Sequence, residues 1–286
     1  MTDRLSDVRA RIGTVEQLAA VITAMRGIAA ARAREARGQL DGIRRYAGMI
    51  GTAIGRALSF LPEPERSGQA RGVHAIIALC AEQGFAGAFS ARVLDVVDGL
   101  TRAEPGQRTE LLLIGDRGLQ AARERGLEVA WSAPMVSRAG QVSGLANRIA
   151  EALYERLDSG LVARVTLVHA LPGEAAAIQI AETKLVPFDF DRFTMPRGAV
   201  EPLLTMSPRV LLENLVEEYV FAELCEAVLL SYAAENEARM RAMIAARTNV
   251  ADTLDELIAL SRQLRQEEIT NEIIELAGGA AANAGR

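Results

Sequence analysis

The chain has 286 residues, of which 50% are hydrophobic, and a formal net charge of −5. This length and apolar content suit one or two soluble domains with a sizeable core and exclude a disordered chain. The acidic balance and the aromatic content of 4% argue against a dedicated nucleic-acid-binding protein, which needs basic patches and stacking platforms.

The N-terminal segment, residues 1–60, is predicted to be one long helix. Steps of three and four residues from Leu5 trace an apolar stripe of heptad character, in which Arg26 is the one polar residue. No residue before Pro62 forces the helix to stop. The stripe comprises Leu5, Val8, Ile12, Val15, Ala19, Ile22, Arg26, Ala29, Ala33, Ala36, Leu40, Ile43, Ala47, Ile50, Ile54 and Ala57.

The middle of the chain changes period and predicts a central α/β domain over 72–187. Short apolar runs suited to strands alternate with helical stretches, which favours a largely parallel sheet with an antiparallel edge strand. The strands are expected at 73–80, 111–114, 127–132, 164–170 and 175–186, and the helices near 88–100, 116–125 and 141–158. Loops with several prolines flank the domain at 61–71 and 187–208, and the second loop supplies a linker, 188–208.

The C-terminal segment, 209–286, is predicted to be a second long helix, because no glycine or proline occurs from Arg209 to Ala277. As a single helix it would be on the order of 100 Å long, more than a compact domain can bury. It too carries an apolar stripe, interrupted by Asn236 and Asn271. The apolar positions are Leu215, Ala222, Leu229, Met243, Val250, Leu257 and Leu264.

The two long helices are expected to pair as an antiparallel coiled coil. Residues 1–45 contain nine Arg and five acidic residues, whereas 209–277 contains six Arg and fourteen acidic residues. The opposite charges support the pairing, although two solvated helix faces would give the same counts, since surface ion pairs contribute little individually. The predicted fold class is therefore α/β, with a long antiparallel coiled coil of the N- and C-terminal helices and a small central domain.

Motifs for catalysis, cofactors or metals are not found in the sequence. There is no Gly-x-Gly-x-x-Gly, no phosphate loop and no Gly-x-Ser-x-Gly elbow. His74 and His169 have no ligand partner at suitable spacing and are expected to be structural, and Cys80 and Cys225 are expected to be core thiols. No apolar run reaches the roughly 20 residues that span a bilayer and no apolar signal core is present, so we expect a cytosolic chain that could serve a membrane complex.

Two runs in the C-terminal segment form a specific signature. Residues 265–272 read Arg-Gln-Glu-Glu-Ile-Thr-Asn-Glu and are followed by an Ala-rich end, and residues 237–243 read Glu-Ala-Arg-Met-Arg-Ala-Met. Both resemble the gamma subunit of F-type ATP synthases, with its terminal Arg-Gln-x-x-Ile-Thr-x-Glu and its Glu-Ala-Arg-Met-x-Ala-Met run. At the N-terminus, Arg11-Ile12, Val15 and Ala24-Met25 keep the spacing of that family.

The resemblance covers the whole chain and implies a non-catalytic subunit, the central rotor shaft of a rotary ATP synthase. Such a shaft couples ion flow through a membrane ring to ATP synthesis or hydrolysis in a ring of alternating alpha and beta subunits. The implied partners are the alpha and beta subunits, an epsilon-type small collar subunit and the membrane c-type ring. The implied location is the cytoplasmic face of a bacterial membrane.

The resemblance also implies residues that contact the partner ring. Arg265 and Gln266, with Thr270 and Glu272 about one helical turn further along, are implied to contact loops of the beta subunits. On the N-terminal helix, we expect Met25 to be an apolar knob that faces the ring. We expect Arg26 to turn outward towards acidic loops of the ring, because a charge inside an apolar seam needs an anion or water.

The sequence also departs from this family. The usual Ser-Asp-Arg-Gly-Leu-Cys-Gly turn is Ala-Glu-Gln-Gly-Phe-Ala-Gly at residues 81–87, and the customary Ala-Ser-Lys-Met is Ala-Ala-Arg-Ala at 30–33. These changes suggest a divergent bacterial branch and leave the coupling ion open. Two other functions remain as alternatives: a free-standing coiled-coil adaptor, and a nucleotide-binding α/β enzyme, which the missing phosphate motif opposes.

Overall fold

The computed structural model describes residues 2–61, 72–104, 106–173, 178–193 and 204–284. The chain divides into two compact units. Unit 1 consists of Met1–Ile28 and Met240–Arg286, and unit 2 consists of Ala29–Arg239. Residues 62–71 of the predicted loop at 61–71 and the middle of the predicted loop at 187–208 lie outside the described residues, as does the start of the strand expected at 175–186.

Two long helices are present, as the sequence predicts. Helix α1 covers Thr2–Leu58 and helix α5 covers Pro208–Ala284. Every position of the predicted N-terminal stripe is buried or half-buried, from Leu5 at 5% exposure to Ala57 at 2%. The apolar stripe of α5 is also buried or half-buried from Leu215 to Leu264, whereas Asn271 is exposed.

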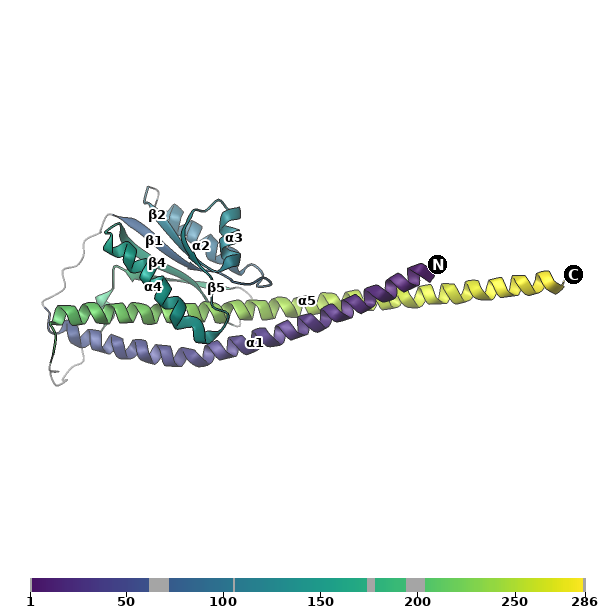
Figure 1. Ribbon diagram of the computed structural model, residues 1–286, viewed down its shortest axis with the longest axis horizontal. Coiled ribbons are helices and arrows are strands. Elements are labelled where there is room, and N and C mark those ends of the chain that lie inside the picture. Colours follow the sequence, from purple (N-terminus) through teal and green to yellow (C-terminus); the bar gives the residue numbers. More distant parts are fainter. Residues whose placement is uncertain (1, 62–71, 105, 174–177, 194–203, 285–286) are drawn as a thin grey trace. The chain divides into compact units, whose positions relative to one another are not determined.

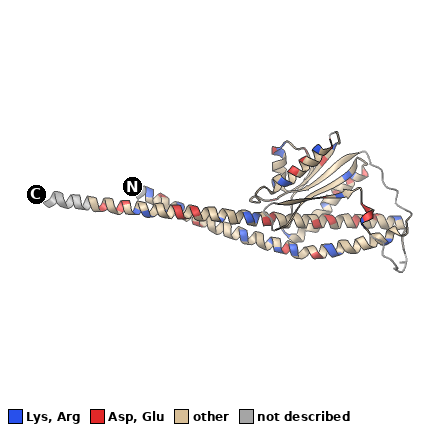
Figure 2. Cartoon of the chain, turned by 180° about the vertical axis from the view of Figure 1, so that it is seen from behind, with Lys and Arg blue, Asp and Glu red and all other residues tan. Residues whose placement is uncertain are grey.

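In unit 2 the two helices run antiparallel, and opposite charges meet between them. Arg37 pairs with Glu237, and the Arg44 Nε atom lies 2.7 Å from the Glu226 Oε1 atom, so numbers rise along α1 as they fall along α5. The Tyr46 hydroxyl donates to the Glu218 carboxylate at 2.6 Å. Figure 2 shows basic and acidic residues along both long helices.

The central domain contains a five-stranded sheet in the order β3-β2-β1-β4-β5. The β3-β2, β2-β1 and β1-β4 pairs are parallel and the β4-β5 pair is antiparallel, which confirms the predicted sheet. The strands are β1 (Val73–Leu79), β2 (Thr109–Ile114), β3 (Val129–Ala133), β4 (Val162–Leu171) and β5 (Gln179–Val186). The helices are α2 (Phe89–Ala103), α3 (Asp116–Glu124) and α4 (Val142–Asp158), with short 3-10 turns at η1 (Ala139–Gln141) and η2 (Phe190–Arg192).

The sheet separates two layers of helices within unit 2. Residues of β1 alternate between two cores: Ala75, Ile77 and Leu79 pack with α4, α1 and α5, whereas Ile76 and Ala78 pack with α2 and α3. This alternation follows from the period of two along a strand. Figure 1 shows the part of α5 in unit 2 lying between the sheet and α1.

Because α5 is covered on both sides in unit 2, its central part is buried all round. Every residue of α5 from 227 to 239 is buried, including four polar residues that follow one another closely in sequence. A helix with only one apolar stripe cannot be buried in this way, so the Ala- and Leu-rich composition of this segment reflects two packing partners. These four are Glu235, Asn236, Glu237 and Arg239, and Ser231 is buried one turn earlier.

An aromatic cluster joins the segment after β5 to both long helices. The rings of Phe188 and Phe193 stack with centroids 5.5 Å apart, and both meet Tyr219 of α5 edge to face. A Cβ atom at Gly51 of α1 would lie 3.1 Å from the Phe193 ring, so the missing side chain makes room for this contact. The Arg192 guanidinium pairs with Glu223 at 2.9 Å and closes the cluster.

Candidate functional site

The residues predicted to contact a partner ring all belong to unit 1. Arg265, Gln266, Thr270 and Glu272 are exposed on α5, where the Thr270 hydroxyl donates to the Gln266 carbonyl oxygen at 2.8 Å. Met25 and Arg26 are half-buried on α1. No hydrogen bond or ion pair links these two groups to each other in the described part of the chain, so they form two separate candidate contacts.

The two helix segments of unit 1 bury an apolar seam, and they also expose large apolar side chains that lie outside this seam. On α1, Leu18, Val21 and Ile28 are about half exposed, at 49%, 54% and 53%. Their spacing of three and seven residues places them on one face of the helix, distinct from the seam. The exposed apolar residues of α5 in the same unit are Ile244, Leu260, Ile269, Ile273 and Ile274.

A second candidate site lies in unit 2, where α5 meets the loop that follows β1. The Glu235 carboxylate accepts hydrogen bonds from the amides of Glu82 and Gln83, both at 3.4 Å, and also from the Arg239 guanidinium. Arg239 in turn donates to the carbonyl oxygens of Gly84 at 3.2 Å and Gln83 at 3.3 Å. One buried ion pair of α5 therefore binds both donors and acceptors of the same loop.

The pair is buried, and both of its members are hydrogen-bonded. The side chains of Glu235 and Arg239 are 3% and 6% exposed, and burial raises the pKa of Glu235 although Arg239 opposes the shift. The Asn236 carboxamide accepts from Arg239 at 3.2 Å and donates to the Tyr232 carbonyl oxygen at 2.8 Å. The guanidinium is thus held from the helix side as well as from the loop side.

Glu82 extends this junction, the contact of Glu235 and Arg239 with the loop after β1, to the neighbouring strands. Its carboxylate accepts from the amide of Met135, after β3, at 2.7 Å and from the amide of Asp116, at the start of α3 after β2, at 3.2 Å. The loops that follow β1, β2 and β3 are therefore tied together by one side chain. In doubly wound sheets this edge, at the carboxyl ends of the strands, is where ligands usually bind. In this chain, the amides at this edge donate hydrogen bonds to carboxylates of the chain itself.

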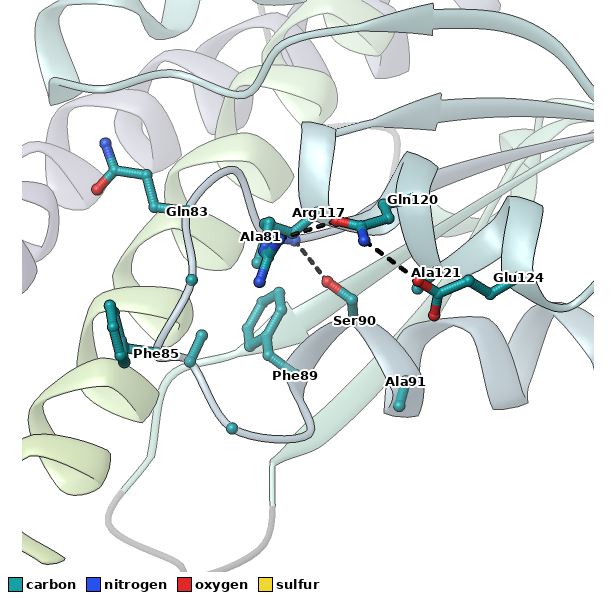
Figure 3. A pocket seen from close by; sticks show the side chains of 13 residues that line it. Ala81, Gln83, Phe85, Phe89, Ser90, Ala91, Arg117, Gln120, Ala121 and Glu124 are labelled. Carbon is teal, nitrogen blue, oxygen red and sulfur yellow. Dashed lines mark hydrogen bonds between the residues drawn. The ribbon is translucent and has the colours of Figure 1, made fainter. Parts of the chain in front are cut away.

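Residues of the same loop line a pocket together with residues of α2 and α3. Figure 3 shows Gln83 and Phe85 projecting from the loop and the hydrogen bond between the Ala81 amide and the Ser90 hydroxyl, which measures 3.2 Å. Phe85 is 67% exposed and has a φ of 63°, in the left-handed region that a bulky residue rarely adopts. Such a backbone persists only where its surroundings fix it, and the contacts of Arg239 with Gln83 and Gly84 do so.

Glu237 makes a further connection from the same turn of α5. Its carboxylate pairs with Arg37 of α1 and accepts from the Gly173 amide, after β4, at 3.0 Å. One α5 carboxylate therefore joins α1 to the β4 end of the sheet, while Glu235 joins α5 to the β1 end.

The two histidines and the two cysteines are buried in unit 2. The Arg164 guanidinium can only donate, so the His74 Nδ1 atom accepts from it at 3.3 Å and Nε2 donates to the Thr166 hydroxyl at 2.8 Å. Burial lowers the pKa of His74 and of His169, and it raises the pKa of the Cys80 thiol to about 12 and of Cys225 to about 11. Both cysteines are buried free thiols, as predicted.

The described residues contain no group of three His, Cys, Asp or Glu side chains arranged to hold a metal ion. None of the helices in the described ranges combines the length and hydropathy that crossing a bilayer requires.

The sequence does not predict the contact between α5 and the loop after β1. It shows Glu237 and Arg239 in a signature run and residues 81–87 as a departure from a family pattern, and nothing in it places the two together. A local signal exists: a Glu and an Arg four residues apart, at 235 and 239, belong with Asn236 and Glu237 to a polar group that follows the largely apolar run 227–234. A Glu and an Arg at this spacing lie on one helix face and can form an ion pair.

The fold defines a class of protein in which two long helices, antiparallel in unit 2, pack with a doubly wound α/β domain, and carboxylates of the chain accept hydrogen bonds from amides at the carboxyl ends of its parallel strands. The chain belongs to the ATP synthase family, whose model matches residues 4–282. Curated relatives are ATP synthase gamma chains, and the chain is a gamma-type, non-catalytic member of this family.

Similarity to these relatives extends over whole chains. The ATP synthase gamma chain of Solibacter usitatus is 28% identical, with 97% of this chain and 98% of that protein covered. The gamma chain of Frankia casuarinae is 29% identical, with 99% and 98% covered. Among solved structures, a chain of the Euglena gracilis mitochondrial ATP synthase, from an OSCP/F1/c-ring assembly, matches with a TM-score of 0.67, 12% identity and coverage of 99% and 95%.

Proposed function

We propose that this chain is the central rotor shaft of a bacterial rotary ATP synthase, which couples ion flow through a membrane ring to ATP synthesis or hydrolysis in a ring of alternating alpha and beta subunits. In this proposal residues 1–60 and 209–286 form the shaft, 72–187 form the collar and 188–208 form the linker. The chain itself carries no catalytic residue and no cofactor. Catalysis belongs to the partner ring.

The observation that carries the proposal is the exposed apolar face of unit 1. A coiled coil that works alone in water buries its seam and covers the rest of its surface with polar residues. Here Leu18, Val21 and Ile28 form a second apolar face outside the seam. A face of this kind marks an interaction surface, and a smooth apolar bearing suits a shaft that turns inside a ring.

The partners follow from the family. We assign the alpha and beta subunits to the exposed face of unit 1, and an epsilon-type small collar subunit and the membrane c-type ring to the other end of the rotor. Support comes from a fold neighbour, a chain of the Euglena gracilis ATP synthase rotor, which matches with a TM-score of 0.63 at 14% identity, covering 94% of this chain and all of that chain. The proposed location is the cytoplasmic face of the cell membrane, as a peripheral subunit.

The mechanism is mechanical. A shaft whose faces differ makes different contacts with catalytic subunits that are otherwise equal, and each rotation step shifts their populations of open and closed states. We assign contacts with beta-subunit loops to Arg265, Gln266, Thr270 and Glu272. Met25 and Arg26 are proposed to face the ring, with the Arg26 guanidinium directed towards its carboxylates.

The assigned contacts can be tested by substitution in the reconstituted complex. Arg265→Ala removes an exposed cation that makes no ion pair with any other described residue. We expect a lower rate of ATP turnover with assembly intact, because a contact with the catalytic loops is lost. Arg262→Ala, an exposed arginine one turn earlier on α5, is the matched control. Equal turnover in the two variants would remove Arg265 from the mechanism.

A further inference from the structure

The buried ion pair of α5 does not owe its presence to packing. Glu235 and Arg239 lie within the segment in which every residue is buried, among Ala, Leu and Val side chains of α5 and the sheet. Removing two charges from water is costly, and replacing a buried ion pair by apolar side chains of similar volume is often neutral or stabilising. The pair therefore calls for a role other than stability, and fixing one arrangement of the parts is the best-attested role of this kind.

The geometry of the pair is suited to fixing position. The apolar contacts between α5 and the sheet are non-directional, so they specify position only through the close packing of their side chains. Hydrogen bonds are directional, and the pair makes them with two amides and two carbonyl groups on residues 82–84. Bonds to both donors and acceptors of one loop specify its place along α5 and its rotation around α5.

The loop after β1 also connects the carboxyl ends of three strands of the sheet. Glu82, whose amide is bound by Glu235, binds with its carboxylate the amides of Asp116 and Met135, which follow β2 and β3. A force applied to the loop is thus passed directly to the ends of three parallel strands. Phe85, next to the carbonyl that Arg239 binds, has a φ of 63°, a conformation that a bulky residue adopts only where its surroundings fix it.

We propose that the Glu235–Arg239 pair is the latch that fixes the angular register of the α/β domain on α5, so that torque passes between shaft and collar without slip. Both are positioning residues. The proposal rests on the rotor function proposed above and adds to it the residues that transmit the torque within the subunit.

The test uses a double variant that keeps the fold. Glu235→Leu combined with Arg239→Met replaces both charges by apolar side chains of similar size, so no unpaired charge is left in the core. The matched control is Glu226→Leu with Arg44→Met, which removes an ion pair between α5 and α1 that does not involve the loop after β1. Both variants are reconstituted with the partner subunits in sealed membrane vesicles.

Two rates are measured on each complex: ATP hydrolysis and ATP-driven ion uptake. The latch variant is expected to hydrolyse ATP at the wild-type rate, while the number of ions moved per ATP falls at least about twofold. The control is expected to keep the wild-type ratio. An unchanged ratio in the latch variant would overturn the proposal. A wild-type complex that hydrolyses ATP without moving ions would instead overturn the rotor function.

A second measurement reads the register directly in the free chain. Spin labels at Gln39→Cys on α1 and Arg123→Cys on α3 are both exposed and both in unit 2, and the native Cys80 and Cys225 are buried. We expect one narrow distance distribution in the wild-type background and a broad one in the latch variant. A narrow distribution in both would count against the latch. If the double variant does not fold, Arg239→Lys, which keeps the charge but loses the planar fork, is expected to broaden the distribution to an intermediate degree.

Discussion

The same two helices behave differently in the two units. In unit 2, α5 is buried on every side from 227 to 239, because α1 covers one side and the sheet covers the other. In unit 1 only the seam is buried, and Leu18, Val21 and Ile28 remain half exposed on a second face. A helix with apolar residues on two faces can pack against two surfaces. In unit 2 the chain supplies both surfaces, whereas in unit 1 we expect a partner to supply the second.

The strongest test of the contrast removes one charge from the core of unit 2. Glu235→Ala leaves the Arg239 guanidinium buried and uncompensated, and we expect the free energy of unfolding to fall by about 3 to 5 kcal/mol. Denaturant unfolding followed at Trp131, the single tryptophan of the chain, measures it. Glu226→Ala, which breaks a partly exposed pair, should cost no more than about 1 kcal/mol. Equal losses of unfolding free energy in the two variants would show that the buried pair contributes no more to stability than the partly exposed pair.

A pair of leucine substitutions compares the two faces directly. Leu229 is fully buried in unit 2, and Leu229→Ala should cost about 2 to 5 kcal/mol of unfolding free energy. Leu18 is 49% exposed, and Leu18→Ala should change the stability of the free chain by less than about 0.5 kcal/mol. In the complex the order changes: Leu18→Asp should weaken assembly with the partner ring. Normal assembly of Leu18→Asp would mean that this face of unit 1 has no partner.

Acid should affect only one of the two units through histidine. Burial lowers the pKa of His74 and His169, so the native state binds protons less readily than the unfolded chain, whose histidines keep the ordinary value of 6.5. Stability is therefore full above that value and is lost as the pH falls through it towards the lowered pKa. Both histidines belong to unit 2, and unit 1 has none.

The measurement is the unfolding midpoint at Trp131 on either side of pH 6.5, in the wild type and in His74→Gln. The variant should lose part of the dependence on pH, because one of the two groups that cause it is gone. An unchanged dependence would assign the effect to His169 or to carboxylates.

Much of this fold could be predicted from local patterns. The heptad stripe predicts the seam of α1 at every position. Short apolar runs predict the strands at 73–80 and 111–114, and the alternation with helical stretches predicts the other three. The junction could not be predicted, because Glu235 meets an amide about 150 residues away in sequence and no local pattern specifies that contact. The aromatic contact at Gly51 was missed for the same reason, since a glycine in a helix does not indicate which ring will pack on it. The roles of Arg26 and Arg265 remain predictions, because they concern surfaces of other chains.

Observing rotation of the chain inside the partner ring is the most direct test of the proposed rotor function. A rod attached to the exposed Arg123→Cys on α3 would be observed while the partner ring is immobilised and hydrolyses ATP. We expect stepwise rotation of the rod in one direction that depends on ATP and stops when ATP is removed. A complex that hydrolyses ATP while the rod shows only random fluctuation, with the label in place and the subunit bound, would contradict the account.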